Sequence, residues 1–248
     1  MVTDFLLPLP KIRIMEIRPI ARIHTDFTEK FGIPRQSGLA SSLCGRIVFE
    51  PAYRNPEALR GLEAFSHIWL IWEFSANMRR GASAEVEWQP TVRPPRLGGN
   101  THLGVFATRS PFRPNPLGLS CVQVAEIEQD TPDGPIIHVK GADLMDGTPI
   151  YDIKPYIVYA DSHPDAKSGF VDSLSEKRLE VIYESHVRDR AIDEELLHSL
   201  TEVLSLDPRP AYQNDPHREY GLSFAGMNVR FKVMGETLTV VSIESSVF

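Results

Sequence analysis

The chain has 248 residues, of which 42% are hydrophobic, and this size permits one large domain or a domain with a smaller companion. No apolar run approaches 18 residues, and residues 1–13 lack the basic start and cleavage site of a signal peptide, so we expect no membrane partner. Cys44 and Cys121 lie far apart without a metal-like spacing, which favours reduced thiols and a cytoplasmic protein.

The formal net charge of −7 argues, taken alone, against a nucleic-acid partner. However, residues 76–120 carry six arginines and two glutamates, a net charge of +4 that leaves −11 for the rest of the chain. Such a local basic face is compatible with RNA binding, and the alternative is that these arginines pair with acids elsewhere in the fold. The arginines are Arg79, Arg80, Arg93, Arg96, Arg109 and Arg113.

The first predicted elements are two short strands separated by a long loop. Residues 15–24 alternate between apolar and polar, which predicts an edge strand, and residues 44–49 predict a second strand. The loop between them, residues 25–42, has neutral donors and acceptors and a glycine at its centre, in the sequence QSG. It is suited to wrap a polar ligand, and the alternative is an ordinary turn.

A short helix and a strongly β-like run come next. Asn55 is typical of an N-cap before Pro56, so we expect a helix over residues 56–62. Residues 65–74 are aromatic, branched and largely unbroken, which predicts a central strand buried on both faces. His67 in this strand is either a hydrogen-bonded core residue or part of a pocket wall.

Proline-rich loops carry the arginines. Residues 105–107 are apolar and predict a short strand. It leads into residues 108–116, where two arginines lie among three prolines. Because proline fixes φ and removes a backbone donor, we expect a stiff, extended loop that either binds a ligand or forms a rigid surface. Residues 92–100 predict a second such loop, preceded by a short strand at residues 84–88.

Further strands follow this region. Residues 121–129 and 136–140 predict a hairpin, and residues 150–159 predict another strand. Between them lies an Asp-Gly turn at residues 143–149, which is either a plain turn or, given its many polar side chains, a binding loop.

The composition changes after residue 160. We expect a first domain over residues 15–160, a linker at 161–175 and a small α+β domain over 176–248. The elements predicted in this last domain are a strand at 179–185, a helix at 193–206, and a hairpin of residues 227–234 and 237–243.

Several common site motifs are absent from the sequence. There is no P-loop, no GxGxxG, no HExxH or cysteine-pair spacing and no GxSxG, so we expect no metal site and no Rossmann-type cofactor site. Many strands with almost no helix before residue 160 predict an antiparallel barrel or sandwich.

Several long strings occur together in one order, and their combination is specific. The strings are PRQSG (34–38), LRGLEAFSHIWLIW (59–72), VRPPRLGGN with GVFATRSPFRPNPLGLS (92–120), DLMDGTPIYDIKPY (143–156) and LDPRPAYQNDPHREYG (206–221). In this combination the chain resembles the TrmO family, the S-adenosylmethionine-dependent tRNA methyltransferases that act at N6 of adenosine 37.

The resemblance implies a mainly β fold, with a non-Rossmann antiparallel β-barrel that binds the methyl donor and a small α+β C-terminal domain. It implies a homodimer with the donor site near the subunit interface. The implied substrate is tRNA that already bears threonylcarbamoyl on adenine 37, and the implied product is its N6-methylated form. Met145 stands where the family commonly has valine, an apolar exchange that puts little in doubt.

The resemblance also suggests roles for individual residues. Arg93, Arg96, Arg109 and Arg113 are expected to bind the threonyl carboxylate and anticodon-loop phosphates, with Arg96 assigned to the donor as well. Asn115 is expected to read a base edge or the carbamoyl group. The expected donor-binding residues are Arg35, Gln36, Ser37, His67, Arg96, Asp146, Gly147, Thr148 and Pro149, and the expected catalytic residues are Asn115, His67 and Asp143.

A sulfonium donor is already activated, so the enzyme mainly has to align the methyl group with its acceptor. A modest proton acceptor such as Asp143 or His67, or water, would then suffice. Two other functions remain open. One is a non-catalytic RNA-binding module, and the other is a methyltransferase for a small adenosine-like or metal-chelating metabolite.

Overall fold

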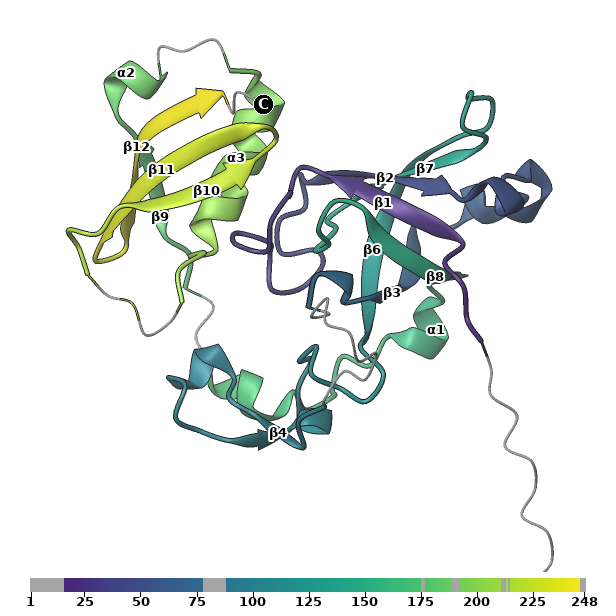
Figure 1. Ribbon diagram of the computed structural model, residues 1–248, viewed down its shortest axis with the longest axis horizontal. Helices are drawn as coiled ribbons and strands as arrows, with labels where there is room; N and C mark the ends of the chain where they lie inside the picture. The colour runs from purple at the N-terminus through teal and green to yellow at the C-terminus, as the bar shows by residue number, and fades with distance from the viewer. Residues whose placement is uncertain are drawn as a thin grey trace, which may run out of the picture.

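The computed structural model describes residues 16–77, 88–174, 177–188, 192–210, 213 and 215–245. Arg79, Arg80 and all but the last residue of the strand predicted at 84–88 lie outside the described residues. Two bodies are visible in Figure 1, a β-barrel from the first part of the chain and a four-stranded sheet from the last part.

Six strands form the barrel, closed in the order β1-β2-β7-β6-β3-β8 with every neighbouring pair antiparallel. This confirms the predicted mainly β fold. Ile23, Ile47, Ile68 and Leu70 are fully buried at its centre, as expected where alternate strand residues point inward. The strands are β1 (Ala21–Thr25), β2 (Cys44–Phe49), β3 (His67–Glu73), β6 (Leu117–Glu128), β7 (Ile136–Lys140) and β8 (Thr148–Pro155).

Several short elements lie in the segments that connect or follow the barrel strands. Asn55 caps a 3₁₀ turn as predicted, its side chain accepting a hydrogen bond of 3.1 Å from the Glu57 backbone N–H. Two tiny strands, β4 (Thr91–Val92) and β5 (Leu103–Gly104), pair with each other, and α1 (Val158–Asp161) follows β8. The 3₁₀ turns are η1 (Pro51–Tyr53), η2 (Pro56–Leu59), η3 (Leu62–Ala64), η4 (Ser75–Asn77), η5 (Pro95–Leu97), η6 (Val105–Ala107) and η7 (Gly169–Ser173).

Three sequence expectations about these elements are wrong. Strand β3 is not buried on both faces, because Ile68, Leu70 and Trp72 point into the barrel and the alternate residues are only partly covered or exposed. Residues 105–107 form the turn η6 instead of a strand, and α1 replaces the end of the strand predicted to reach residue 159. Apolar runs this short do not distinguish strands from turns.

The C-terminal part forms a separate α+β body. Its sheet has the order β10-β11-β12-β9, with β9 parallel to β12. Strand β10 has no counterpart among the predicted elements, whereas the predicted hairpin is observed as β11 and β12. The elements are β9 (Glu180–Tyr183), α2 (Ser185–Arg188), α3 (Glu194–Ser205), β10 (Tyr220–Phe224), β11 (Met227–Met234) and β12 (Thr237–Ser245).

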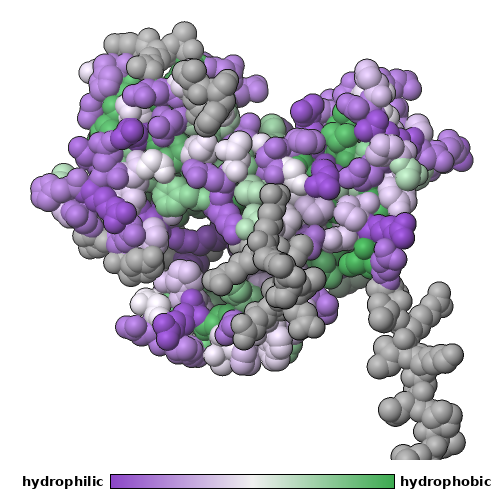
Figure 2. All heavy atoms as spheres, viewed as in Figure 1, coloured by the Kyte–Doolittle hydropathy of each residue, from purple (hydrophilic) through white to green (hydrophobic). Residues whose placement is uncertain are grey.

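The two bodies share part of one hydrophobic core. Helix α3 packs Leu200, Val203 and Leu204 against this sheet, and the same cluster includes Phe27 and Leu43 from the loop between β1 and β2. Hydrophilic residues cover most of the outer surface in the view of Figure 2. In the described part of the chain, no helix is long and apolar enough to cross a membrane.

A substitution at Gly118 would test the packing inside the barrel. A Cβ at this position would overlap the ring of Trp72, so Gly118→Ala must displace a buried side chain. We expect a loss of about 1–3 kcal/mol in the free energy of unfolding, measured with urea. Gly104→Ala is the matched control, because a Cβ there meets nothing within 4 Å, and we expect a change below about 0.5 kcal/mol. Equal losses in the two variants would refute this account.

Candidate functional site

Three long loops lie at one end of the barrel. The register pairs Thr25 with Gly45, Lys140 with Cys44 and Glu73 with Leu117, so β1, β3 and β7 end where β2, β6 and β8 begin. The loops that leave this end span residues 26–43, 74–116 and 141–147. They carry every predicted site residue except His67 and two at the start of β8, Thr148 and Pro149, so the closed topology gathers segments that are distant in sequence.

Asp143 lies at the centre of this end. The Ser120 hydroxyl donates to Asp143 Oδ1 at 2.6 Å and accepts a hydrogen bond of 3.0 Å from the buried Trp72 indole N–H. Burial raises the pKa of Asp143, while the hydrogen bonds from Ser120 and the Ser37 backbone and the charge of Arg109 lower it less strongly. The result is a carboxyl group that holds a proton more readily than an ordinary aspartate.

The two predicted ligand loops meet beside this carboxyl group. The Arg109 guanidinium donates to the side-chain oxygen of Gln36. The Gly38 backbone N–H donates to the carbonyl of Gly141 at 2.8 Å, and a Cβ at Gly141 would lie 3.2 Å from the Gly38 Cα. The two backbones therefore approach each other closely at these glycines, and both have positive φ.

Arg35 and Arg96 form the positive side of the site. Arg35 is exposed, and its Nη2 donates to the Asp207 carbonyl at 3.2 Å. Partial burial lowers the pKa of Arg35, the charge of Arg96 lowers it further, and Asp207 partly offsets both. Two guanidiniums this close favour an anion between them. Arg93 lies three residues before Arg96 in the chain, and its Nε lies 2.9 Å from His102 Nε2.

Arg113 and Asn115 differ in how their side chains are used. Arg113 donates to the Thr108 carbonyl at 2.7 Å and lies 5.7 Å from the centre of the Phe106 ring, so it supports its own loop. Asn115 is exposed, and its side chain makes no hydrogen bond to any described residue. Of these two predicted substrate contacts, Asn115 is the one whose side chain is available to a ligand.

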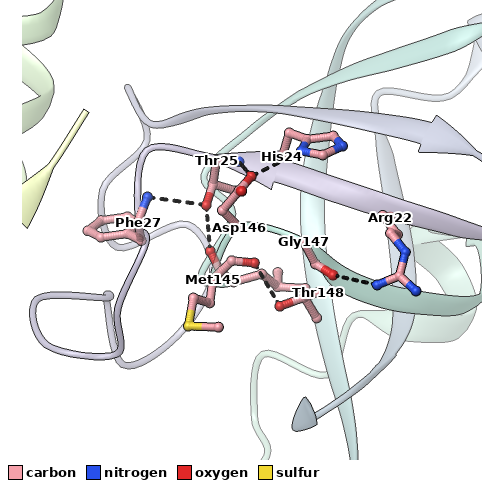
Figure 3. A network of polar contacts seen from close by, with 9 residues as sticks. Arg22, His24, Thr25, Phe27, Met145, Asp146, Gly147 and Thr148 are labelled. Carbon is pink, nitrogen blue, oxygen red and sulfur yellow. Dashed lines mark hydrogen bonds and ion pairs between the residues drawn. The ribbon is translucent and has the colours of Figure 1, made fainter. Parts of the chain in front are cut away.

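The Asp146–Pro149 turn is bonded to strand β1, as Figure 3 shows. Asp146 Oδ1 lies 3.1 Å from His24 Nδ1 and accepts a hydrogen bond from the Thr25 backbone N–H. The Gly147 carbonyl accepts from Arg22 at 3.0 Å. The buried Thr148 donates its hydroxyl to the Met145 carbonyl at 2.7 Å, and Pro149 is buried. These contacts close the barrel between β1 and β8, so this turn serves the fold at the rim of the site.

His67 lies apart from the other predicted residues. It begins β3 and pairs with Gln123, while Glu73 at the site end of the same strand pairs with Leu117. Six residues of strand place it about 20 Å from that end. His67 is exposed, with Nδ1 2.9 Å from the Ser66 hydroxyl. Within one chain, it does not join the site.

Sequence reasoning missed two participants, Ser120 and Trp72. Both point into the barrel below Asp143, and an isolated serine in a strand gives no signal by itself. Among the described residues, no cluster of three or more His, Cys, Asp or Glu is arranged to hold a metal ion.

Comparisons with known proteins agree over nearly the whole chain. The family model of the tRNA-methyltransferase O N-terminal domain matches residues 22–162, and that of the TrmO C-terminal domain matches residues 176–246. An Escherichia coli K12 protein named tRNA (adenine(37)-N6)-methyltransferase is 39% identical over 92% of this chain and 97% of its own length.

Two comparisons involve Pseudomonas aeruginosa. A protein named putative S-adenosylmethionine-dependent methyltransferase RcsF is 38% identical over 87% of this chain and 91% of its own length. A crystal structure of TrmO from this organism superposes with a TM-score of 0.75 and 30% identity, covering 94% of this chain and 99% of that one.

The raised pKa of Asp143 predicts a gain in stability on neutralisation. Its folded pKa lies above the ordinary value of 3.8, so its contribution to stability is present below that value and is lost as pH rises through the folded pKa. We expect Asp143→Asn to unfold at a higher temperature than wild type at pH 7, by a difference that shrinks as pH falls toward 4.

Scanning calorimetry across this pH range measures the effect. Asp165→Asn, at an exposed position in the segment after β8, is the control and should show no such pH-dependent gain. A melting temperature for Asp143→Asn below that of wild type at pH 7 would contradict the assignment of burial as the dominant effect.

Proposed function

This chain belongs to the TrmO family, and from that premise we propose that it methylates N6 of adenosine 37 in tRNA with S-adenosylmethionine as donor. The proposal specifies threonylcarbamoyladenosine 37 as the substrate nucleoside and its N6-methyl form as the product. The observation that carries it is the junction of Gln36, Arg109 and Asp143, which joins the two ligand loops at one end of the barrel.

The donor would lie on residues 34–38. The donor's carboxylate suits the pair Arg35 and Arg96, because each guanidinium feels the charge of the other and the Arg35 hydrogen bond goes to a neutral carbonyl. Only the carbonyl groups of Ser37 and Gly38 would face its polar edges, since their N–H groups already donate to Asp143 and to the Gly141 carbonyl. The donor supplies a methyl group on a sulfonium, and the chain's own contribution is to hold and orient it.

The transfer needs alignment and a place for one proton. N6 forms a bond to the methyl carbon, the carbon–sulfur bond breaks with its electron pair returning to sulfur, and the N6 proton leaves. Asp143 is the proposed acceptor of that proton, because its raised pKa makes it a better base than an ordinary aspartate. Asn115, on the loop that also carries Arg109, has an exposed side chain and would orient the carbamoyl group or the base.

The basic loops would hold the RNA. Arg109 and Arg93 lie on the loop between β3 and β6, where positive charge is concentrated, and are the proposed contacts to the threonyl carboxylate and the phosphates. An anticodon loop is single-stranded, so presenting adenine 37 costs less unstacking than in a duplex. A tRNA substrate and two unpaired cysteines fit a cytoplasmic enzyme.

An apolar outer face supports the proposed homodimer. Leu119, paired with Ile71 on the outer side of β6, is 55% exposed, and on α1 Val158 and Tyr159 are 71% and 90% exposed. Trp69 links strand β3 to helix α1, since its indole N–H donates to Asp161 at 3.2 Å. An exposed cluster of this kind is typical of a protein interface. The adjoining loop with Phe106 would place the donor site near the partner subunit.

Transfer of labelled methyl from the donor tests the proposed function. We expect the label at position 37 of tRNA that carries threonylcarbamoyl, and little in tRNA without it. Arg109→Ala should lower kcat/KM by about 100-fold while shifting the melting temperature little, because this exposed arginine has no core to support. Arg60→Ala, on the far end of the barrel, is the control and should keep full turnover.

The alternatives give different results. RNA binding that ignores the donor, with no transfer, would favour a binding module. Transfer only to small molecules, with tRNA affinity that does not fall with salt, would favour a metabolite methyltransferase. A large fall in melting temperature for Arg109→Ala would make this residue structural.

The apolar face gives a prediction for assembly. We expect sedimentation to show a dimer for the wild type and a monomer for the double variant Leu119→Glu, Tyr159→Glu, because charge cannot be buried in that interface without large cost. Met234→Glu changes an equally exposed apolar residue, 74% exposed, on the other body and should remain a dimer. A monomeric wild type, or a dimeric double variant, would refute this interface.

A further inference from the structure

The loop of residues 26–43, which we call the donor loop, is held by the C-terminal body along most of its length. Phe27 packs edge-on against Phe224 with ring centres 5.3 Å apart. Ala40 and Leu43 near its other end are buried in the same core cluster as helix α3. The donor loop is thus part of the hydrophobic core of a domain to which it does not belong in sequence.

The first part of the donor loop follows the tip of the hairpin β10–β11. The Asp26 carbonyl accepts from the Ala225 N–H at 2.9 Å, and the Thr28 and Ser223 hydroxyls lie 3.1 Å apart. Gly32 has φ +91° and approaches Leu222 so closely that a Cβ would overlap that side chain. This part is held by backbone contacts and close packing.

Glu202 of α3 holds the last part of the donor loop. Its carboxylate accepts from the Ser42 backbone N–H at 2.8 Å and from the Ser42 hydroxyl at 2.5 Å. Burial alone would raise the pKa of Glu202, but these bonds, with the charges of His198 and Arg178, lower it overall, which indicates a stabilised carboxylate. Arg178 also donates to the Leu39 carbonyl at 2.7 Å.

The middle of the donor loop is fixed through Arg35. The carbonyl of Asp207 that accepts from Arg35 belongs to a residue with φ +50°, a strained conformation for a non-glycine residue. Arg209, only 8% exposed, fixes the Asp207 carboxylate with two bonds of 2.8 and 2.9 Å.

The net charge of the C-terminal body indicates that this body acts on the donor loop and does not bind the RNA. Residues 176–248 contain eight Lys and Arg against thirteen Asp and Glu, a net charge of −5. An acidic body repels RNA phosphates. Two of its eight cationic groups, Arg178 and Arg209, donate to a donor-loop carbonyl and to Asp207.

We propose that the C-terminal domain positions the donor loop for S-adenosylmethionine, with Glu202 and the Asp207–Arg209 pair as positioning residues that do not contact substrate. The inference rests on the proposed function, since it takes residues 34–38 as the donor site. A loop of this length loses much conformational entropy on ordering, and contacts made before the donor arrives remove that cost from binding.

Glu202→Gln tests the proposal, with Glu195→Gln on the exposed side of the same helix as the matched control. We expect the donor KM of Glu202→Gln to rise about tenfold, with the tRNA KM within twofold of wild type. Hydrogen exchange should speed up at residues 38–43, and the melting temperature should change little. Glu195→Gln should match wild type in all four measurements. Ser42→Ala removes the hydroxyl on the loop side and should give the same pattern if Glu202→Gln does not fold.

The outcomes separate this proposal from the function on which it rests. Faster exchange with an unchanged donor KM, or equal rises in both KM values, would overturn the positioning role while leaving the methyltransferase assignment intact. A wild type that neither binds the donor by calorimetry nor transfers methyl would overturn the proposed function and with it this inference. Faster exchange in Glu202→Gln would then still show the contact between loop and domain.

Discussion

The structure depends on how an eighteen-residue segment without regular secondary structure is kept in one conformation. Such a segment has no ladder in which to satisfy its backbone groups, so each N–H and C=O must find a partner elsewhere. Residues 26–43 find them on two sides: Gly38 and Leu43 bond to Gly141 on the barrel, and Leu39 and Ser42 bond to the C-terminal body. The position of Arg35 and Gln36 follows from that double attachment.

The barrel contributes a different constraint. Its closure removes the free edges of the sheet and places the ends of β1, β3 and β7 around one rim, so that three loops face one another. Asp143 lies below that rim, where Ser120 and Trp72 form a chain of hydrogen bonds from the barrel interior to its carboxylate. A carboxyl group on a free surface loop would not have its pKa raised in this way, so the fold itself tunes the group.

The regular elements were predictable because their patterns are local. Residues 44–49 alternate and form a strand with the predicted bounds, and Asn55 caps the turn after it. The failures have a common physical reason. Strand β3 is rich in large apolar residues on both faces, but its outer face is open to the surface in one chain, so composition could not reveal which neighbour covers it. His67 has a residue type suited to a site, but the sequence does not reveal that it lies at the end of β3 opposite Glu73.

Arg113 shows how far the site itself could be predicted. The resemblance implies that the arginines among the prolines bind the substrate, and in the structure two of them have different partners. Arg113 bonds the carbonyls of its own loop, whereas Arg109 crosses to the donor loop and bonds Gln36.

This division has an energetic logic. The prolines limit the number of conformations that the loop can adopt. Arg113 stabilises one of these conformations by donating hydrogen bonds to two carbonyls of the loop. The conformational cost of ordering is then met during folding, and Arg109 and Asn115 are left in fixed directions toward the site. On the other side of the same site, the C-terminal body stabilises one conformation of the donor loop, as Arg113 stabilises one conformation of its own loop. Both arrangements place polar groups by means of residues that bond to the protein itself, which is why their roles could not be deduced from residue type alone.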